Sequence, residues 1–327
     1  MTRILITGAS GFIGTHLIEY FSTGKNVEIW GLTRQQTDLL SVRKPKAHWI
    51  QVNLSDRTKL AEVFKQILPD VIYHLAGQAH VASSWEEPAE TVSANVINQI
   101  HLLEALRETC LRPTVLIAGS SEEYGQVEVK DLPVHENTPF RPLSPYAVSK
   151  VAQDLMAYQY FRSYGFRVIR TRAFNHTGPG RPDSYAISGF SKQIAKIEAG
   201  VIEPVLHVGN LKAMRDYLDV RDVVCAYDLA VKKGQPGEAY NICSGKAHSI
   251  EDMVAMLLEL SSVKIRIQQD PNRLRPSDIP VIYGDVSKFH KDTGWEPKIP
   301  FCQTMLDLLN YWRQEVASGC LKQYQRQ

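Results

Sequence analysis

The heptapeptide GASGFIG near the start of the chain constrains the fold more than any other stretch, because it inserts three glycines between a strand pattern and a helix pattern. The apolar run 4–7 precedes it, and residues 12–21 repeat apolar side chains at helical spacing. A glycine turn from strand to helix leaves backbone N–H groups and the positive helix end open to a pyrophosphate. The alternative is a tight turn without a ligand. The residues expected around the phosphates are Gly8, Gly11, Phe12, Ile13 and Gly14.

Short apolar runs rich in β-branched residues alternate with helix patterns through the first half of the chain. The strands are expected at 4–7, 27–32, 49–52, 71–74, 114–118 and 167–171, and the helix patterns at 12–21, 56–68 and 88–109. This alternation is typical of an α/β protein whose parallel sheet is covered by helices on both faces. The sequence therefore predicts a Rossmann-type, doubly wound parallel sheet.

The order loosens after Asn175. A GPGRP cluster is followed by an amphipathic segment at 186–199, scattered short elements and a final helix pattern near 304–317. We expect residues 1–175 to form a dinucleotide-binding Rossmann domain to which later segments return. Residues 176–327 are expected to form mainly a smaller C-terminal α/β lobe for the substrate.

The composition argues against several classes of protein. A formal net charge of +2 does not suggest a nucleic-acid or membrane-surface protein. Five cysteines form an odd set without C-x-x-C spacing, which argues against a disulfide framework and a zinc site, so no metal is expected. There is no long apolar run at the N-terminus and none of membrane-spanning length elsewhere, so we expect a cytoplasmic protein.

The end of the second strand pattern, VEIWGLTRQQ, bears on the choice of cofactor. A carboxylate is expected there when the fold binds the 2′-hydroxyl of NAD, but Thr33 and Arg34 occupy the place instead. A guanidinium beside a hydroxyl suits a 2′-phosphate, so NADP(H) is the preferred cofactor and NAD(H) is possible. The alternative is that Arg34 is a solvated loop residue.

Two further strand ends are expected along the cofactor. Asn53 and Leu54 end the third strand, where an adenine edge would lie. HLAGQAH ends the fourth strand close to the pyrophosphate, and its two histidines are expected to make structural hydrogen bonds. The cofactor residues expected in this segment are Leu75, Ala76 and Gly77.

The stretch SPYAVSK contains a candidate pair for proton transfer. Tyr146 and Lys150 share one helix face because they are four residues apart, and Ser144 and Pro145 suit the N-cap and first helical position. A tyrosine is a poor acid or base at neutral pH unless a nearby cation stabilises its phenolate, and Lys150 supplies that cation. The alternative, a helix-surface pair, would be the better interpretation if the motif stood alone.

The fifth strand pattern ends in IAGSSEEYG. It supplies Ser120, Ser121 and Glu122 where strand ends of open parallel sheets meet a ligand. A serine hydroxyl could hydrogen-bond a substrate oxygen while the tyrosine exchanges its proton. Because the glycine turn and then this strand end precede the Tyr/Lys pair, the proton-transfer interpretation is favoured over a helix-surface pair.

Together, GASGFIG, HLAGQAHV, GSSEEYG and SPYAVSK resemble the extended short-chain dehydrogenase/reductases that act on nucleotide sugars, over nearly the whole chain. GSSEEYG, FNHTGPGR, VGNLKAMRDYLDVRDV and RLRPSDIP are most similar to bacterial GDP-4-dehydro-6-deoxy-D-mannose reductases. The resemblance implies that Ser120, Tyr146 and Lys150 carry the catalysis, with Ser121 an adjacent candidate. It also implies that Asn95 lies on the helix beneath the active site and His176 near the nicotinamide.

The second half contains a group of basic and polar residues suited to a diphosphate, which arginine binds through two directed hydrogen bonds. By the same resemblance, Asn175, Arg215 and Arg275 contact the substrate diphosphate and Asp278 holds its ribose. Arg181 and Asn210 lie in the same matching segments and complete the expected substrate site.

The function predicted from these motifs is hydride transfer from NADPH to C4 of GDP-4-dehydro-6-deoxy-D-mannose, giving GDP-D-rhamnose or its C4 epimer GDP-6-deoxy-D-talose. A GDP-mannose 4,6-dehydratase is the main alternative, because Glu122 stands where dehydratases carry a catalytic carboxylate. A nucleotide-sugar 4-epimerase and a non-catalytic, cofactor-sensing regulator are the others, although a regulator should have lost the Tyr/Lys pair. The resemblance further implies a homodimer through the helices at 88–109 and 146–164.

Overall fold

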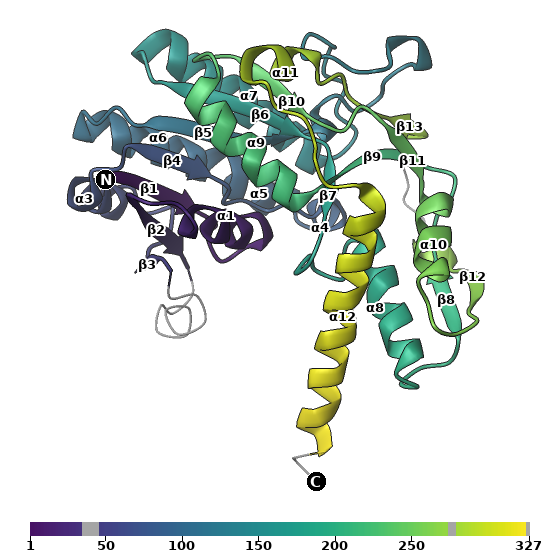
Figure 1. Ribbon diagram of the computed structural model, residues 1–327. Helices are drawn as coiled ribbons and strands as arrows, with labels where there is room; N and C mark the ends of the chain where they lie inside the picture. Colours follow the sequence, from purple (N-terminus) through teal and green to yellow (C-terminus); the bar gives the residue numbers. More distant parts are fainter. Residues whose placement is uncertain (35–45, 274–278, 325–327) are drawn as a thin grey trace.

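The computed structural model describes residues 1–34, 46–273 and 279–324, apart from the side chains of residues 272 and 320–324. A seven-stranded parallel sheet forms the larger body (Figure 1), with strand order β10-β6-β5-β4-β1-β2-β3. The strands are β1 (Thr2–Thr7), β2 (Val27–Thr33), β3 (His48–Gln51), β4 (Val71–His74), β5 (Thr114–Ser120), β6 (Val168–Ala173) and β10 (Ala239–Ile242). The expected α/β fold with a parallel sheet is confirmed, and β10 is a seventh strand that the sequence pattern did not reveal.

Helices cover both faces of this sheet. One face carries α1 (Phe12–Ser22) and α9 (Val220–Lys233), and the other carries α3 (Arg57–Ile67), α6 (Asn98–Thr109) and α7 (Pro145–Tyr164). In β1, Ile4 and Ile6 pack into the first core and Leu5 into the second, because successive side chains of a strand point to opposite faces. Burial on both faces explains why these strands are continuous apolar runs without polar alternation.

The helix pattern at 88–109 contains one irregularity. It forms α5 (Pro88–Val92), a π-helical turn η1 (Ser93–Ile97) and then α6. A π turn holds one more residue than an α turn, so it rotates the side chains that follow, and such turns occur frequently at functional sites. The turn contains Asn95, which is fully buried.

A second lobe lies beside the sheet, at the lower right of Figure 1. It has its own apolar core between α8 (Ala186–Glu198), α10 (Ile250–Glu259) and α12 (Phe301–Tyr324), with the strand pair β8 (Val205–Val208) and β12 (Arg266–Gln269). Helix α12 begins three residues before the helix pattern expected at 304–317 and ends seven residues after it. A third sheet contains β7 (Asn175–Thr177), β9 (Met214–Asp219), β11 (Ala247–Ser249) and β13 (Val281–Ile282).

The strand order positions the site. From β1 the chain runs outward to β2 and β3, and then returns to β4 on the other side of β1. The carboxyl ends of β1 and β4 therefore flank the point at which the connections reverse direction, where ligands of open parallel sheets bind. The glycine turn follows β1, the HLAGQAH segment follows β4, and Ser120 ends β5.

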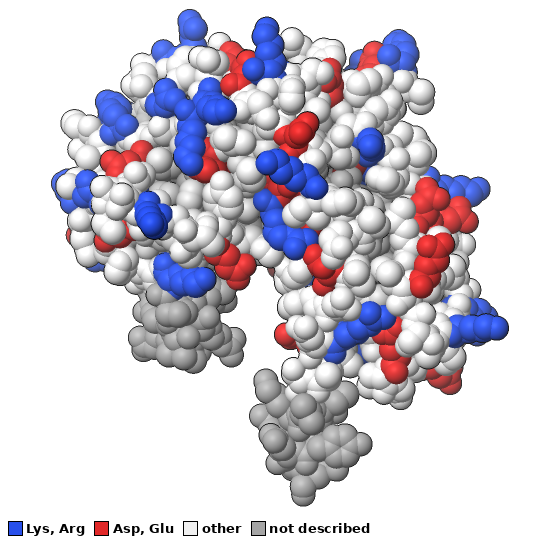
Figure 2. All heavy atoms as spheres, in the orientation of Figure 1, with Lys and Arg blue, Asp and Glu red and all other residues white. Residues whose placement is uncertain are grey.

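On the face that Figure 2 shows, Lys and Arg side chains are interspersed with Asp and Glu, as a net charge near zero would lead one to expect. Across residues 1–34, 46–273 and 279–324, none of the helices combines the length and the apolar character needed to cross a bilayer.

Candidate active site

The glycine turn packs tightly on the end of β4. Gly8 has φ of +67°, and a Cβ atom there would lie 2.8 Å from the backbone nitrogen of Ala76. A Cβ on Gly14 would collide with the Gly8 carbonyl oxygen. Both positions therefore require glycine, because any side chain would push the turn away from β4 or from the helix start.

The first turn of α1 is suited to an anion. Gly11 is the N-cap and provides no side-chain hydrogen bond, so the N–H groups of Phe12, Ile13 and Gly14 have neither an intrahelical acceptor nor a capping oxygen. These groups and the helix dipole point toward the space beyond β1, which is the arrangement that holds a pyrophosphate. The residues present therefore fit a dinucleotide cofactor.

The ends of β2 and β3 lie farther out along the same edge. Thr33 is buried and its carbonyl oxygen accepts a hydrogen bond from Val52, whereas Arg34 is exposed. Asn53 is exposed and Leu54 is buried. The exposed guanidinium at the end of β2 leaves room for a phosphate on the adenosine ribose; residues 35–45, which follow it, lie outside the described part.

Asn95 ties the segment after β4 to α7. Its side-chain oxygen accepts from the Gln78 N–H at 2.7 Å, and its side-chain nitrogen donates to the Gln78 carbonyl at 3.0 Å and to the Ser149 hydroxyl at 2.8 Å. Leu75, Ala76 and Gly77 immediately precede this clamp. The buried amide thus holds the loop that borders the glycine turn.

The two histidines of HLAGQAH make local hydrogen bonds. His74 is within 2.9 Å of the Thr7 hydroxyl, and burial lowers its pKa to about 3, so the ring is neutral. His80 is 3.0 Å from the Ser83 hydroxyl. Both rings therefore make structural hydrogen bonds, as expected from the sequence.

Tyr146 and Lys150 lie in the first two turns of α7, buried against the end of β5. The Ser144 hydroxyl accepts from the Ala147 N–H at 3.1 Å, which confirms Ser144 as the N-cap, and Pro145 begins the helix. The Lys150 ammonium donates to the Ala118 carbonyl at 2.9 Å and lies 5.9 Å from the centre of the Tyr146 ring. The cation and the phenol are therefore on one face of the helix, as their spacing predicted.

Burial changes the acidity of both groups. It lowers the pKa of Lys150 to about 8, and the nearby Glu123 acts in the opposite direction. Burial also raises the pKa of Tyr146, while a hydrogen bond with the Ser120 side chain lowers it. At neutral pH the phenol is protonated and can act as a hydrogen donor.

Ser120, Ser121 and Glu122 form the turn that ends β5. The Ser120 hydroxyl accepts from the Glu122 N–H at 3.2 Å, and Ser121 is buried behind it. Glu122 is partly buried, and its charge acts on Tyr146 by raising the pKa of the phenol. The structure therefore brings the serine hydroxyl, the phenol and a carboxylate together at one strand end.

The segment from Asn175 to Arg181 lies against the start of α1. The His176 ring stacks on Phe12 with 6.2 Å between ring centres, its Nδ1 is 2.9 Å from the Phe174 carbonyl, and burial lowers its pKa to about 3. Its buried Nε2 has no hydrogen-bond partner among the described residues. The guanidinium of Arg181 lies 4.9 Å from the centre of the Phe12 ring. These contacts join the sugar-side segment to the glycine turn.

Sequence reasoning missed two residues of this site. The ring of Tyr185 lies 3.4 Å below the Arg181 guanidinium, and its hydroxyl donates to the Ala79 carbonyl at 3.1 Å. The contact with Ala79 joins segments about 100 positions apart, so RPDSYA by itself does not signal it. Glu123 is wholly buried against Ser120, and the S-x-x-E spacing of a capping box could have revealed it.

The remaining residues expected at the substrate are only partly described. Arg215, on β9, donates to the carbonyls of Met214 at 2.9 Å and Ile279 at 2.5 Å. The side-chain oxygen of Asn210 accepts from the Lys212 N–H at 3.0 Å. Gly209 packs against Arg273, so this segment adjoins the start of RLRPSD, whereas Arg275 and Asp278 lie outside the described residues.

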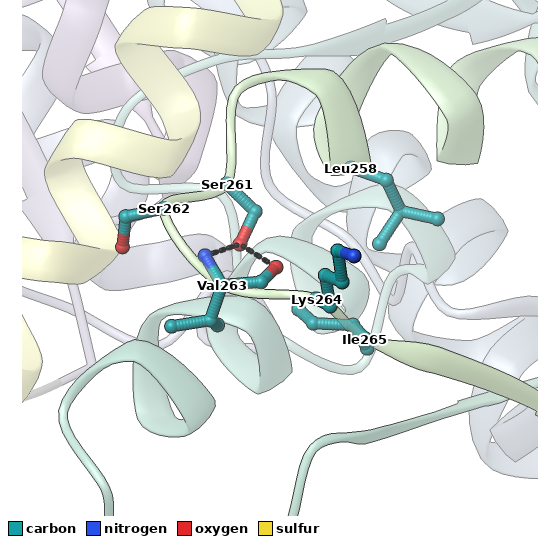
Figure 3. Close-up of a pocket in the computed structure, with 6 residues that line it drawn as sticks. All are labelled: Leu258, Ser261, Ser262, Val263, Lys264 and Ile265. Atoms are coloured by element: carbon teal, nitrogen blue, oxygen red, sulfur yellow. Dashed lines mark hydrogen bonds between the residues drawn. The ribbon is translucent and has the colours of Figure 1, made fainter.

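An open hollow lies outside this site, in the second lobe. It lies at the end of α10, has a volume of about 490 Å³ and is lined by Leu258 and residues 261–265 (Figure 3). Of its polar side chains, Ser261 accepts from the Val263 N–H and donates to the Val263 carbonyl, and the Ser262 hydroxyl lies 3.4 Å from Glu198 Oε1. Both hydroxyls of this hollow therefore already have partners within the second lobe.

Comparison with known proteins identifies the family. A family model described as GDP-mannose 4,6 dehydratase matches residues 5–308. A GDP-6-deoxy-D-mannose reductase of Pseudomonas aeruginosa is 35% identical over 96% of this chain and 98% of its own length. A GDP-mannose 4,6-dehydratase of Yersinia enterocolitica is 29% identical over 91% of this chain and 90% of its own.

A solved structure supports the same relationship. RMD from Pseudomonas aeruginosa complexed with NADPH superposes with a TM-score of 0.86 at 32% identity, covering 96% of this chain and 100% of that one. The resemblance expected from the glycine turn, the Ser-Ser strand end and the Tyr/Lys pair is therefore confirmed, and the chain belongs to the GDP-mannose 4,6 dehydratase family of nucleotide-sugar short-chain dehydrogenase/reductases.

Proposed function

We propose that this protein reduces C4 of GDP-4-dehydro-6-deoxy-D-mannose with NADPH. The observation that carries the proposal is the buried arrangement of Ser120, Tyr146 and Lys150 at the carboxyl end of β5, beside the glycine turn. The full-length relative named as a GDP-6-deoxy-D-mannose reductase supports it. That name favours GDP-D-rhamnose as the product over the C4 epimer.

The chain's own residues would handle the proton in this reaction. The bound cofactor supplies a hydride to C4. Tyr146 donates its phenolic proton to the C4 oxygen, and the Ser120 hydroxyl donates a hydrogen bond to the same oxygen. Lys150 stabilises the phenolate that forms, because its ammonium is on the same helix face and is held by the Ala118 carbonyl. Ser121 is an adjacent hydroxyl for the same oxygen.

The cofactor would lie along the carboxyl edge of the sheet. The first turn of α1 holds the pyrophosphate, and Asn53 and Leu54 border the adenine. Arg34 takes the 2′-phosphate, which favours NADPH over NADH, and the relative solved with NADPH supports this preference. Leu75, Ala76 and Gly77 border the pyrophosphate, Asn95 holds their loop, and His176 lies on the nicotinamide side.

The lobe built around α8, α10 and α12 would hold the GDP-sugar, and the body with the seven-stranded sheet would hold the cofactor. In this proposal Asn175, Arg181 and Arg215 contact the GDP-sugar, and Asn210 lies in the same segment as Arg215. Arg275 and Asp278 complete the substrate site in this proposal. Arginines suit the diphosphate because each guanidinium can donate two parallel hydrogen bonds.

A second function, dehydration of GDP-mannose, is favoured by one observation. Glu122 lies in the turn beside Tyr146, and its charge acts on the phenol. A dehydratase needs such a carboxylate to remove a proton from C5. The relatives at 29% identity include GDP-mannose 4,6-dehydratases, so the chemistry has to be tested directly.

One pair of incubations separates the two functions. With GDP-4-dehydro-6-deoxy-D-mannose and NADPH, we expect loss of absorbance at the nicotinamide band, and NMR of the product identifies rhamnose or 6-deoxytalose. With GDP-mannose and NADP⁺, we expect no reaction, and Glu122→Gln should retain substantial reductase activity. Formation of the 4-keto sugar from GDP-mannose, lost in Glu122→Gln, would establish the dehydratase instead.

The assembly we propose is a homodimer. Large apolar side chains stay exposed on α7 and on the helical segments α4 (Val81–Glu86), α5 and η1 that pack against it, namely Trp85, Val92, Ile97, Val148, Leu155, Tyr158 and Tyr164. Val148 and Leu155 are seven residues apart and lie on one stripe of α7. A stable dimer needs about 800 Å² per partner, and such a face suits a second copy of the same helices. Leu155→Glu should convert a dimer to a monomer in light scattering; an unchanged mass would exclude this face.

The proposed location is the cytoplasm. The four cysteines whose side chains are described, Cys110, Cys225, Cys243 and Cys302, are free thiols. Free thiols are typical of a reducing compartment. Fractionation of cells with an antibody to the chain tests the assignment.

A further inference from the structure

A buried carboxylate with no role in the proposed reaction lies directly behind Ser120. Glu123 is fully buried, and its Oε1 accepts the backbone N–H of Ser120 at 2.7 Å. Gly119 leaves the space that this carboxylate fills, because a Cβ atom there would collide with Glu123 Oε1. Strand β5 therefore ends in a glycine and a serine that are both fitted around one acidic side chain.

The charged residues around Glu123 do not neutralise it fully. Arg172 Nε lies 3.3 Å from Glu123 Oε2, but the same guanidinium donates to Asp154 at 3.0 Å, and to the Tyr124 hydroxyl and the Glu136 carbonyl. Oε2 consequently has no hydrogen-bond partner among the described residues. The titratable and charged groups that face this cluster are Tyr146, Lys150 and Asp154 on α7, Arg170 and Arg172 on β6, Glu122 and Tyr124 beside it, Glu136 on the following loop, and His74 on β4 behind Lys150.

Stability alone does not account for this carboxylate. An incompletely hydrogen-bonded acid in the interior costs folding free energy, and an apolar side chain of similar volume would avoid that cost. Burial and the neighbouring Asp154 raise the pKa of Glu123 to about 8, while Glu123 in turn raises the pKa of Lys150. Costly buried acids of this kind cluster at functional sites.

We propose that Glu123 is a positioning residue for the reductase reaction, which holds Ser120 against Tyr146 through its hydrogen bond to the Ser120 backbone N–H. The inference rests on the proposed function, since it assigns Glu123 a part in the same site. The hydrogen bond and the charge are separable, because glutamine keeps an oxygen acceptor for the Ser120 N–H and removes only the ionisable group.

The test compares Glu123→Gln and Glu123→Leu with wild type, and uses Glu128→Gln as a control because Glu128 is an exposed residue paired with Lys130 at 2.8 Å. Reductase turnover is measured from pH 6 to 10 in the full-length protein. We expect Glu123→Leu to lower kcat by about 10-fold or more with little change in KM, because Ser120 is misplaced. Glu123→Gln should keep kcat close to the wild-type value, because its amide oxygen can still accept the Ser120 N–H.

A second readout does not depend on the substrate. The raised pKa of Glu123 means that this group keeps a proton in the folded state that it releases in the unfolded chain, so its contribution to stability should fall as the pH rises from about 4.5 to 8. In urea unfolding, wild type should therefore lose stability relative to Glu123→Gln across this range, and Glu128→Gln should not reproduce this change. If wild type does not reduce the keto sugar, the proposed function fails, but the unfolding series still tests the buried charge. Wild-type kcat in Glu123→Leu, or a kcat in Glu123→Gln as low as that of Glu123→Leu, would overturn the inference.

Discussion

Replacing Lys150 with methionine should make the protein more stable and less active. Lys150 is buried, and burial lowers its pKa from 10.5 to about 8. At 1.36 kcal/mol per unit of pKa, the folded state bears a cost of about 3 kcal/mol for keeping the ammonium charged at neutral pH. Methionine has a similar length and no charge, so it removes this cost.

Part of the gain is offset by lost interactions. The ammonium donates to the Ala118 carbonyl at 2.9 Å, and a hydrogen bond from a charged donor contributes about 2 kcal/mol net. We therefore expect Lys150→Met to raise the free energy of unfolding by about 1 kcal/mol at pH 7. For a chain of this size that corresponds to a rise in Tm of roughly 1.5 °C. Turnover should fall by about 100-fold or more, because the phenolate of Tyr146 loses its cation.

The pH dependence of the stability gain in Lys150→Met tests whether the buried charge of Lys150 is its cause. A lysine whose folded pKa is lowered destabilises the folded state below that pKa, and the penalty disappears as the pH rises from about 8 to 10.5, where the unfolded chain also loses the proton. Thermal unfolding of wild type and Lys150→Met should therefore differ at pH 7 and converge by pH 10.5. Lys59→Met, at an exposed lysine of α3 paired with Glu62, should show no such gain. A lower Tm for Lys150→Met at pH 7, or a gap that stays constant with pH, would refute the reasoning.

Three other substitutions test the roles proposed for the site. Tyr146→Phe keeps the buried ring and removes the proton donor, so turnover should fall by about 10² to 10⁴ while the unfolding free energy changes by about 1 kcal/mol or less; near-normal turnover would contradict the assignment. Arg34→Ala should weaken NADPH binding, measured by fluorescence titration, by roughly 1.5 to 3 kcal/mol and leave NADH binding unchanged, whereas equal NADPH affinity would remove the case for a 2′-phosphate contact. Arg215→Ala should raise the KM for the GDP-sugar more than it lowers kcat, because a diphosphate contact is remote from C4; unchanged affinity for GDP in calorimetry would exclude that contact.

Local patterns in the sequence were enough to predict the sheet and the order of the motifs. The spacing of glycines after β1, the continuous apolar strands and the Ser-Pro helix start each depend on residues within a few positions of one another, so they can be read directly. The Tyr146 and Lys150 spacing could be interpreted for the same reason, because helix geometry alone puts both on one face. The strand β10 was not predicted, since its four residues join the sheet only through pairing with β6, about 70 positions earlier.

What the tertiary structure decided is the environment of each charge. The sequence shows Glu122 and Glu123 as neighbours of the same type, yet one is partly exposed and the other is wholly buried against Ser120 and Arg172. Likewise, Arg181 could have been a surface charge, but folding brings it between Phe12 and Tyr185. Burial and partners set the pKa of an ionisable group, and both arise from contacts between segments far apart in the chain. The sequence by itself therefore determined which chemical groups are available. Only the tertiary packing determined which of them are shielded from water, charged and close to Tyr146.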